Sequence, residues 1–288
     1  REMGEVVLAA KITHVPTMLL SESVEEGPLR GCRKQAIDGL KEIGRRGREA
    51  GADTVVVLDT HWLVNAGYHI NSNAHFTGNY TSHEFPHFIQ DLEYDFAGNP
   101  ALGDAIAEKA MAKDVFTLSH QVESLDLEYG TVVPMRFIMR EAPDLKIVSV
   151  AGWCTVHSLE SSRKLGEAIM EAIKESDSKV MLLASGSLSH QIWANDDYEA
   201  NNGTFTISSE FNRQMDLRVL ELWEKGETAT FLKMLPEYAK HCSGEGGMHD
   251  TAMLFGALGW DNYEGKGELI GEYFPSSGTG QANVVFSL

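Results

Sequence analysis

Cysteine, basic residues and long hydrophobic runs are all scarce in this chain of 288 residues. Its three cysteines, Cys32, Cys154 and Cys242, are scattered without the spacing of a zinc site, which favours reduced thiols over a disulfide framework. Its 24 Lys and Arg residues face 42 Asp and Glu residues, and the net charge of −18 argues against nucleic acid or an anionic membrane as the main partner. No apolar run approaches the ~20 residues of a membrane-spanning helix, and no signal-peptide pattern opens the chain. We therefore expect a cytoplasmic protein.

What is present is the composition of an ordinary globular α/β protein, with 43% hydrophobic and 23% charged residues. Continuous apolar runs predict buried strands, and residues with helical spacing lie between them. Strands that alternate with helices indicate a single α/β domain over residues 3–288, with a central mixed or largely parallel sheet flanked by helices. The predicted strands are residues 6–12, 54–58, 146–151 and 179–184, and the predicted helices are residues 31–50, 101–113, 158–173, 209–223 and 248–258.

Three of the predicted strands lead within a few residues to a histidine. These are His14 after "VVLAAKIT", His61 after "VVVLDT" and His190 after "KVMLLASGSLS". In open α/β sheets, ligands bind beyond the carboxyl ends of the strands, so the three imidazoles are expected to converge on one site. The alternative is that each histidine has a separate structural role.

Two imidazoles and one carboxylate on one side of a metal form the facial triad of non-haem Fe(II) oxygenases. His14 and His61 are the imidazole candidates, and Glu245, between glycines in "HCSGEGGMHD", is the carboxylate candidate, with Asp250 as its competitor. His190 is then available for acid–base work, because histidine titrates near neutral pH. The same ligands would also suit a zinc or manganese hydrolase.

Residues 65–99 contain four histidines and several aromatic residues but no clear periodicity. They are predicted to form a long irregular loop, which in a compact domain is often functional.

Six motifs stand in order along the chain and together resemble one family. They are "KITHVPTM", "DTHW", "LEYGTVVPM", "SGSLSH", "GEGGMHD" and "SSGTGQANVVF". Their combination is similar to the class III (LigB-type) extradiol ring-cleaving dioxygenases, from about Val6 to the C-terminus. "SHEFPHF" and "LPEYAKHCSGEG" add likeness to the branch that cleaves homoprotocatechuate (3,4-dihydroxyphenylacetate).

The resemblance implies a LigB-like fold and Fe(II) bound by His14, His61 and Glu245, with His190 as the acid/base beside it. It implies that a catechol and O2 are the small-molecule partners, and that no organic cofactor is needed. The expected reaction, in aromatic catabolism, converts 3,4-dihydroxyphenylacetate to 5-carboxymethyl-2-hydroxymuconic semialdehyde. The alternatives are cleavage of another ring such as protocatechuate or an aminophenol, or a LigB-fold hydrolase or non-enzymatic binding protein.

The chain departs from the family at one motif. Many relatives carry Asp-His-Gly where this chain has Glu128-Tyr129-Gly130, so Tyr129 and His120 are the candidates for a second acid/base. A substrate carboxylate would need a local cation, because an unpaired buried charge is costly, and Arg136 is the candidate for it. We expect a homo-oligomer with no nucleic-acid or membrane partner.

Overall fold

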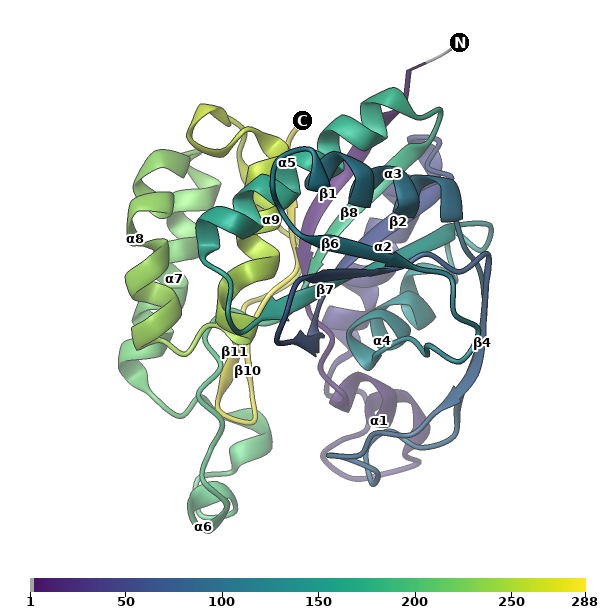
Figure 1. Ribbon diagram of the computed structural model, residues 1–288. Coiled ribbons are helices and arrows are strands. Elements are labelled where there is room, and N and C mark those ends of the chain that lie inside the picture. The colour runs from purple at the N-terminus through teal and green to yellow at the C-terminus, as the bar shows by residue number, and fades with distance from the viewer. Residues whose placement is uncertain (1–2) are drawn as a thin grey trace.

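The computed structural model describes residues 3–288, which form a single α/β domain around one sheet (Figure 1). The sheet has eight strands in these residues, in the order β6-β3-β7-β2-β8-β1-β12-β9. Their bounds are β1 Glu5–Ile12, β2 Thr54–Val64, β3 Tyr68–Asn71, β6 Thr117–His120, β7 Lys146–Cys154, β8 Lys179–Ser185, β9 Gly267–Leu269 and β12 Val284–Phe286.

The centre of the sheet is parallel, and antiparallel pairs lie toward its edges. Strand β2 pairs in parallel with both β7 and β8, and β8 pairs in parallel with β1. Strand β12 runs antiparallel to β1 and β9, and β3 runs antiparallel to β7. The predicted mixed or largely parallel sheet is therefore confirmed. The parallel strands bring the carboxyl ends of β1, β2 and β8 to the same edge.

Helices cover both faces of this sheet (Figure 1). One face carries α1 (Thr17–Ser23), α2 (Lys34–Glu49) and α4 (Tyr129–Ile138), and the other carries α3 (Pro100–Met111), α5 (Leu159–Glu175) and α9 (His249–Leu258). A further pair, at the left of Figure 1, consists of α7 (Glu210–Glu224) and α8 (Thr228–His241).

The apolar run of β2 explains why the sheet is covered on both sides. Successive side chains of a strand point to opposite faces. Val57 packs in the apolar cluster that contains Leu40 of α2, whereas Leu58 packs in the cluster that contains Leu165 of α5. All four side chains are fully buried. Full burial of an aliphatic side chain contributes about 1.5–3 kcal/mol, so the two interfaces stabilise the sheet from both sides.

Side chains that cap the first turns fix where several helices begin. Asn99 accepts a hydrogen bond from the Leu102 N–H and starts α3, and Ser158 accepts one from the Ser161 N–H and starts α5. Such caps satisfy backbone donors that have no partner inside the helix. Among residues 3–288, no helix is long and apolar enough to span a membrane.

The prediction of a long loop over residues 65–99 is wrong. This stretch contains β3 and a hairpin of β4 (His75–Tyr80) and β5 (Leu92–Ala97). In β5 the side chains alternate between buried and exposed, with Tyr94 and Phe96 on the buried side. This period of two is a strand signal that the histidines and aromatic residues obscured.

Short elements near the C-terminus were not predicted from the sequence. They include the hairpin of β10 (Phe274–Ser276) and β11 (Thr279–Gln281), as well as α6 (Asn195–Tyr198) and three 3-10 helices, η1 (Gly203–Phe205), η2 (Glu245–Met248) and η3 (Trp260–Asn262). Segments of three or four residues are too short to show a periodicity.

Candidate metal centre and active site

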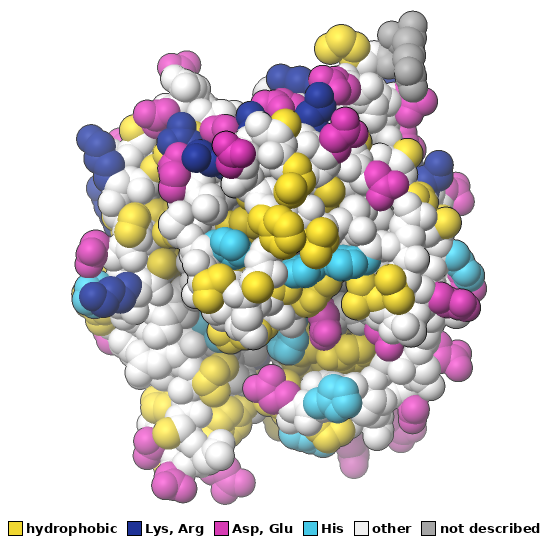
Figure 2. Space-filling model, in the orientation of Figure 1, with side chains coloured by type: hydrophobic (Ala, Val, Ile, Leu, Met, Phe, Trp, Pro, Cys, Tyr) yellow, Lys and Arg dark blue, Asp and Glu magenta, His cyan; other side chains and the backbone are white. Residues whose placement is uncertain are grey.

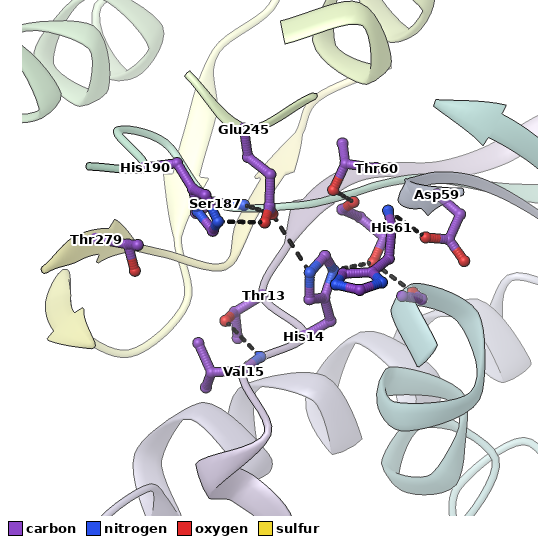
Figure 3. A network of polar contacts seen from close by, with 12 residues as sticks. Thr13, His14, Val15, Asp59, Thr60, His61, Ser187, His190, Glu245 and Thr279 are labelled. Carbon is purple, nitrogen blue, oxygen red and sulfur yellow. Dashed lines mark hydrogen bonds and ion pairs between the residues drawn. The ribbon is translucent and has the colours of Figure 1, made fainter. Parts of the chain in front are cut away.

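Five of the predicted site residues line one pocket beyond the carboxyl ends of β1, β2 and β8, and four of them are labelled in Figure 3. His14 follows β1 by two residues, His61 lies in the last part of β2, and His190 follows β8 by five residues. Glu245 is the first residue of η2. These three strands are neighbours in the order β2-β8-β1. The sheet therefore gathers side chains that are far apart in the sequence.

Glu245 lies between two of the histidines (Figure 3). Its Oε1 is 3.3 Å from Nε2 of His14, and its Oε2 is 3.1 Å from Nε2 of His190. Oε1 also accepts a hydrogen bond of 2.7 Å from the N–H of Ser187. Glu245 is only 6% exposed. A buried carboxylate is costly unless positive charge lies near it.

The electrostatic environment favours an ionised Glu245. Burial alone would raise its pKa, but His190 and His14, together with the hydrogen bonds to it, hold the pKa of Glu245 well below its usual range. Burial alone would lower the pKa of His14, but the charge and hydrogen bond of Glu245, together with the charge of Asp59, raise this pKa overall. The pKa of His61 is lowered to about 4, chiefly by burial and then by His14. His61 is therefore a neutral imidazole at pH 7, which is the form that binds metals.

Hydrogen bonds to the far nitrogens orient the two histidines that contact Glu245. The hydroxyl of Ser185 donates to the Gly130 carbonyl at 2.5 Å, so its lone pair is left to accept from Nδ1 of His14 at 2.9 Å. This places the His14 proton on Nδ1 and leaves Nε2 as an acceptor that faces the pocket. Nδ1 of His190 lies 2.7 Å from the Ser187 hydroxyl in the same manner.

The lone pairs of His14 and Glu245 are arranged in a way that suits a cation. Nε2 of His14 and Oε1 of Glu245 are both acceptors at 3.3 Å, so a proton or a metal ion must lie between them for the contact to be favourable. Two adjacent ligands held about 2.1 Å from one ion lie about 3 Å apart. The spacing therefore fits a metal ion.

His61 lies beside this pair. Its ring centroid is 6.0 Å from that of His14, and its Nε2 is 3.9 Å from Oε2 of Glu84. Its backbone N–H donates to Asp59, which also accepts from the Thr131 hydroxyl. In residues 3–288, no three His, Cys, Asp or Glu side chains already form a metal-binding group.

The competing carboxylate, Asp250, has another partner. Its Oδ2 lies 2.6 Å from Nζ of Lys11, and both side chains are buried. This ion pair lies inside the fold, and Asp250 does not line the pocket. Of residues 245–250, only Glu245 lines the pocket. Gly246 and Gly247 make this possible, because their φ values of 59° and 67° lie in the left-handed region that favours glycine.

Tyr129 lies in the pocket, at the start of α4. Its ring centroid is 3.6 Å from that of His61 and 5.3 Å from that of His14. Burial, followed by the charge of Glu245, raises the pKa of Tyr129 well above its usual value. The phenol therefore stays protonated and can act as a hydrogen-bond donor.

His120 does not lie with these residues. It ends β6, the edge strand, and β3 and β7 separate β6 from β2. Its Nε2 is 2.8 Å from Nδ1 of His69, and both line a different surface groove. The expectation that His120 lies near the site is therefore corrected by the order of the strands, which its sequence position does not reveal.

Arg136, the candidate partner of a substrate carboxylate, is also outside this pocket. It is exposed on α4 and lines a separate groove together with Glu22 and Asp91. A residue on a helix can point to any side, and the position of Arg136 after "TVVPM" did not specify which.

The rest of the pocket is lined by both apolar and polar side chains. Sequence reasoning gave no role to the polar residues of the β10–β11 hairpin, although "SSGTGQ" was part of the resemblance. The apolar lining residues are Val15, Phe85, Phe88 and Ile192, and the polar ones are Thr17, Ser276, Ser277, Thr279 and Gln281.

Known proteins resemble this chain over nearly its full length. A protein of Escherichia coli named 3,4-dihydroxyphenylacetate 2,3-dioxygenase is 55% identical over 92% of this chain and 94% of its own length. The beta subunit of a 2-aminophenol 1,6-dioxygenase from Pseudomonas sp is 25% identical over 99% of this chain and 95% of its own length.

A solved structure is similar in fold alone. It is that of an uncharacterized protein from Escherichia coli K12, with a TM-score of 0.63 and 13% identity, covering 98% of this chain and all of that one. Residues 8–287 match the family described as the catalytic LigB subunit of aromatic ring-opening dioxygenase. The chain therefore belongs to the LigB family of aromatic ring-opening dioxygenases.

Proposed function

We propose that this protein is an Fe(II)-dependent extradiol dioxygenase that opens the ring of 3,4-dihydroxyphenylacetate with O2. The expected product is 5-carboxymethyl-2-hydroxymuconic semialdehyde. The observation that carries this proposal is the buried Glu245 carboxylate between His14 and His190, in a pocket that His61 also lines. The 55% identity to a relative named for this substrate supports the choice of ring.

The proposed iron ligands are His14, His61 and Glu245, the two-histidine, one-carboxylate set of non-haem iron sites. When bound, ferrous iron would hold the catechol oxygens and O2 and let electrons pass from the ring to oxygen. The Ser185 hydroxyl, which accepts from Nδ1 of His14, would keep the ligating Nε2 of that histidine unprotonated.

His190 is the proposed acid/base. Its Nε2 faces the pocket, and its side chain is 31% exposed, so it can exchange protons with a catechol hydroxyl and with solvent. The Ser187 hydroxyl at 2.7 Å from Nδ1 holds the ring in place. Tyr129, the proposed second proton donor, would hold a hydrogen bond to the substrate or to oxygen without losing its own proton.

The apolar walls would bind the flat ring and keep water away from it. Phe85 and Phe88 line the pocket from one segment, and Val15, next to His14 in the sequence, lines it too. Removing water from the pocket strengthens each polar contact within it.

The test is a substrate panel with protein that has been loaded anaerobically with Fe(II). The panel contains 3,4-dihydroxyphenylacetate, protocatechuate, catechol and 2-aminophenol, and O2 uptake and the absorbance of ring-opened product are followed for each. We expect the highest kcat/KM for 3,4-dihydroxyphenylacetate. A higher value for 2-aminophenol would instead favour the activity named for the more distant relatives. No O2 uptake with any of the four would contradict the proposed function.

We also propose that the protein is a cytoplasmic homo-oligomer. The cysteines Cys32, Cys154 and Cys242 are free, which suits a reducing compartment. Apolar side chains are exposed near the β6 edge, a type of surface that often mediates assembly. In Figure 2 hydrophobic and histidine side chains occupy the middle of the viewed face, and most charged side chains lie toward its rim. Sedimentation velocity would show a single monomeric species if this proposal were wrong. The exposed large apolar side chains in β6 and directly beside it in the sequence are Phe116, Leu118 and Val122.

A further inference from the structure

Two cationic side chains are buried among residues 3–288, and they differ in their partners. Lys11 is 1% exposed and Arg33 is 4% exposed. Lys11 forms an ion pair with Asp250 at 2.6 Å. Arg33 has no carboxylate partner in the described part of the chain, and the groups that act on its charge are the Cys32 thiol and the Tyr198 phenol. A buried guanidinium without an anion is costly. An anionic ligand beside Arg33 would therefore be stabilised.

The guanidinium of Arg33 is held firmly in one orientation. Its Nε donates to the Thr17 hydroxyl at 2.9 Å, and its Nη2 donates to the Thr204 carbonyl at 2.9 Å. It also lies 5.0 Å from the ring centroid of Phe274 and 5.5 Å from that of Phe205. Cation–π contacts of this kind fix the plane of the group. Its Nη1 makes no hydrogen bond to any residue within 3–288, so donors remain for a ligand.

The position of Arg33 is immediately behind a wall of the proposed active site. Thr17, to which its Nε donates, lines the pocket three residues after His14. On the other side, the Tyr198 hydroxyl lies 3.0 Å from both the Thr204 and the Ser277 hydroxyls, and Ser277 also lines the pocket. Arg33 does not itself line the pocket; it lies directly behind it, between Thr17 at the start of α1 and Phe274 of β10.

The charge of the pocket makes this cation significant. Glu245 and Glu84 are the carboxylates that line it, and the whole chain carries a net charge of −18. A substrate with a second negative charge would be repelled unless a cation compensated for it. Glu245 is committed to His14 and His190. Among residues 3–288, Arg33 is the nearby cation that no carboxylate neutralises, and its Nη1 donors are free to form charge-assisted hydrogen bonds to a substrate carboxylate.

We propose that Arg33 determines specificity by binding the side-chain carboxylate of the catechol substrate. This inference rests on the proposed function, because it concerns the same pocket and the same ring. The Thr17 hydroxyl, whose oxygen accepts from Arg33, has its own proton free to donate to the same carboxylate. Arg33 is a binding residue that positions the ring, and it takes no part in the transfer of protons or electrons.

The test compares two substrates that differ in charge, in the wild type and in Arg33→Gln. The substrates are 3,4-dihydroxyphenylacetate and 4-methylcatechol, with the protein loaded with Fe(II). We expect Arg33→Gln to raise the KM for 3,4-dihydroxyphenylacetate about 10- to 100-fold, the loss of one charged hydrogen-bonded pair. The kcat/KM for 4-methylcatechol should change less than about threefold, since that ring has no carboxylate to lose.

The matched control is Arg30→Gln, which removes the same charge from an exposed position three residues earlier. Arg30 donates only to the backbone carbonyls of Val24 and Glu25, so both substrates should behave as in the wild type. An equal loss of kcat/KM for both substrates in Arg33→Gln would show a structural role and overturn the inference. So would a KM for 3,4-dihydroxyphenylacetate that stays unchanged.

A second variant covers the case in which Arg33→Gln does not fold. Arg33→Lys keeps the charge but loses the two-pronged geometry, and it should raise the KM for 3,4-dihydroxyphenylacetate less than Arg33→Gln does. Inhibition by phenylacetate, which has the carboxylate but no catechol, gives a readout that is independent of turnover of the acid. The Ki of phenylacetate is measured with 4-methylcatechol as the substrate. It should rise by the same factor as the KM for 3,4-dihydroxyphenylacetate, and an unchanged Ki would contradict the inference. A wild type inactive on every catechol would reject the proposed function instead.

Discussion

The molecule contains two groups of histidines, and they are built differently. His14, His61 and His190 share a pocket with a buried carboxylate, Glu245. His69 of β3 and His120 of β6 contact each other at 2.8 Å, in a surface groove whose lining among the described residues contains no Asp or Glu. In the second group one imidazole is the partner of the other, whereas in the first group hydroxyls contact the far nitrogens of His14 and His190. Proximity of histidines is therefore not enough to indicate a metal site.

The carboxylate and the hydroxyl contacts explain the difference. Nε2 of His69 donates to the Ala66 carbonyl, which leaves its Nδ1 to accept from His120. That pair is satisfied without an ion. The contact between His14 and Glu245 joins two acceptors and needs a proton or a metal ion between them. We expect changes in the first group to affect the metal and changes in the second to leave it unaffected.

The largest effect is expected from the carboxylate. Glu245→Gln keeps the shape of the side chain but removes the charge, so Fe(II) affinity should fall at least about a hundredfold, more than the loss of an outer hydrogen bond would cause. His120→Gln is the matched change in the second group and should keep full iron. Metal content after anaerobic loading and gel filtration measures both. Full iron in Glu245→Gln, with loss of iron in Asp250→Asn, would show that Asp250 and not Glu245 is the carboxylate ligand.

The next effect concerns proton transfer. His190→Asn should keep iron and bind the catechol but turn over about 10²–10⁴-fold more slowly, the usual contribution of one general acid–base group. His69→Asn should turn over at the wild-type rate. Single-turnover product formation and iron content are measured on the same samples. Near-normal turnover of His190→Asn with intact iron would remove His190 from the mechanism.

A smaller effect is expected from the hydroxyl behind His14. Ser185→Ala removes the acceptor of the Nδ1 proton, and Fe(II) affinity should fall about 10- to 100-fold. The control is Ser119→Ala, because Ser119 bonds Ser72 and Asp104 beside the second histidine group. Competition with a chelator measures affinity in both. Equal iron affinity in the two variants would contradict the role given to Ser185.

The smallest effect concerns the stability of the fold, and it compares two carboxylates, Glu128 and Glu42, whose pKa values are shifted in opposite directions. Burial, followed by the charges of Asp59 and Asp126, raises the pKa of Glu128 to about 7 from 4.5. A raised carboxyl pKa favours the protonated folded form, so this group costs stability as pH rises from about 4.5 to about 7. Glu128→Gln should therefore melt higher than the wild type at pH 8 and equally at pH 4.

Glu42 on α2 should behave in the opposite way. Hydrogen bonds from Arg45 and Arg46 lower its pKa to about 2 from 4.5. Glu42→Gln should melt slightly lower than the wild type at pH 8, because ionised Glu42 stabilises the folded state above its unfolded pKa. The effect is small because the Glu42 side chain is partly exposed to solvent, which screens its charge. Thermal melts of metal-free protein at the two pH values measure both variants. A lower melting temperature of Glu128→Gln at pH 8 would contradict the cost assigned to Glu128.

Consecutive residues carry much of this protein's organisation. The apolar runs that form β1, β2, β7 and β8 predicted the strands, and their full burial follows from that composition. The position of His14, His61 and His190 after strands predicted a common site, since parallel strands end at one edge. Cap residues such as Ser158 mark helix starts for the same local reason.

The tertiary structure decided what depends on distant partners. The order of the strands put His120 away from the pocket, and no local pattern encodes which strands become neighbours. Lys11 forms an ion pair with Asp250, which is 239 positions away in the sequence. Glu245 is therefore the carboxylate of residues 245–250 that lies in the pocket. Arg33 became a candidate only when Thr17 and Phe274 were seen to enclose it. Burial and pairing are properties of the whole fold, because the free energy of a charge depends on every group packed around it, whatever its place in the chain.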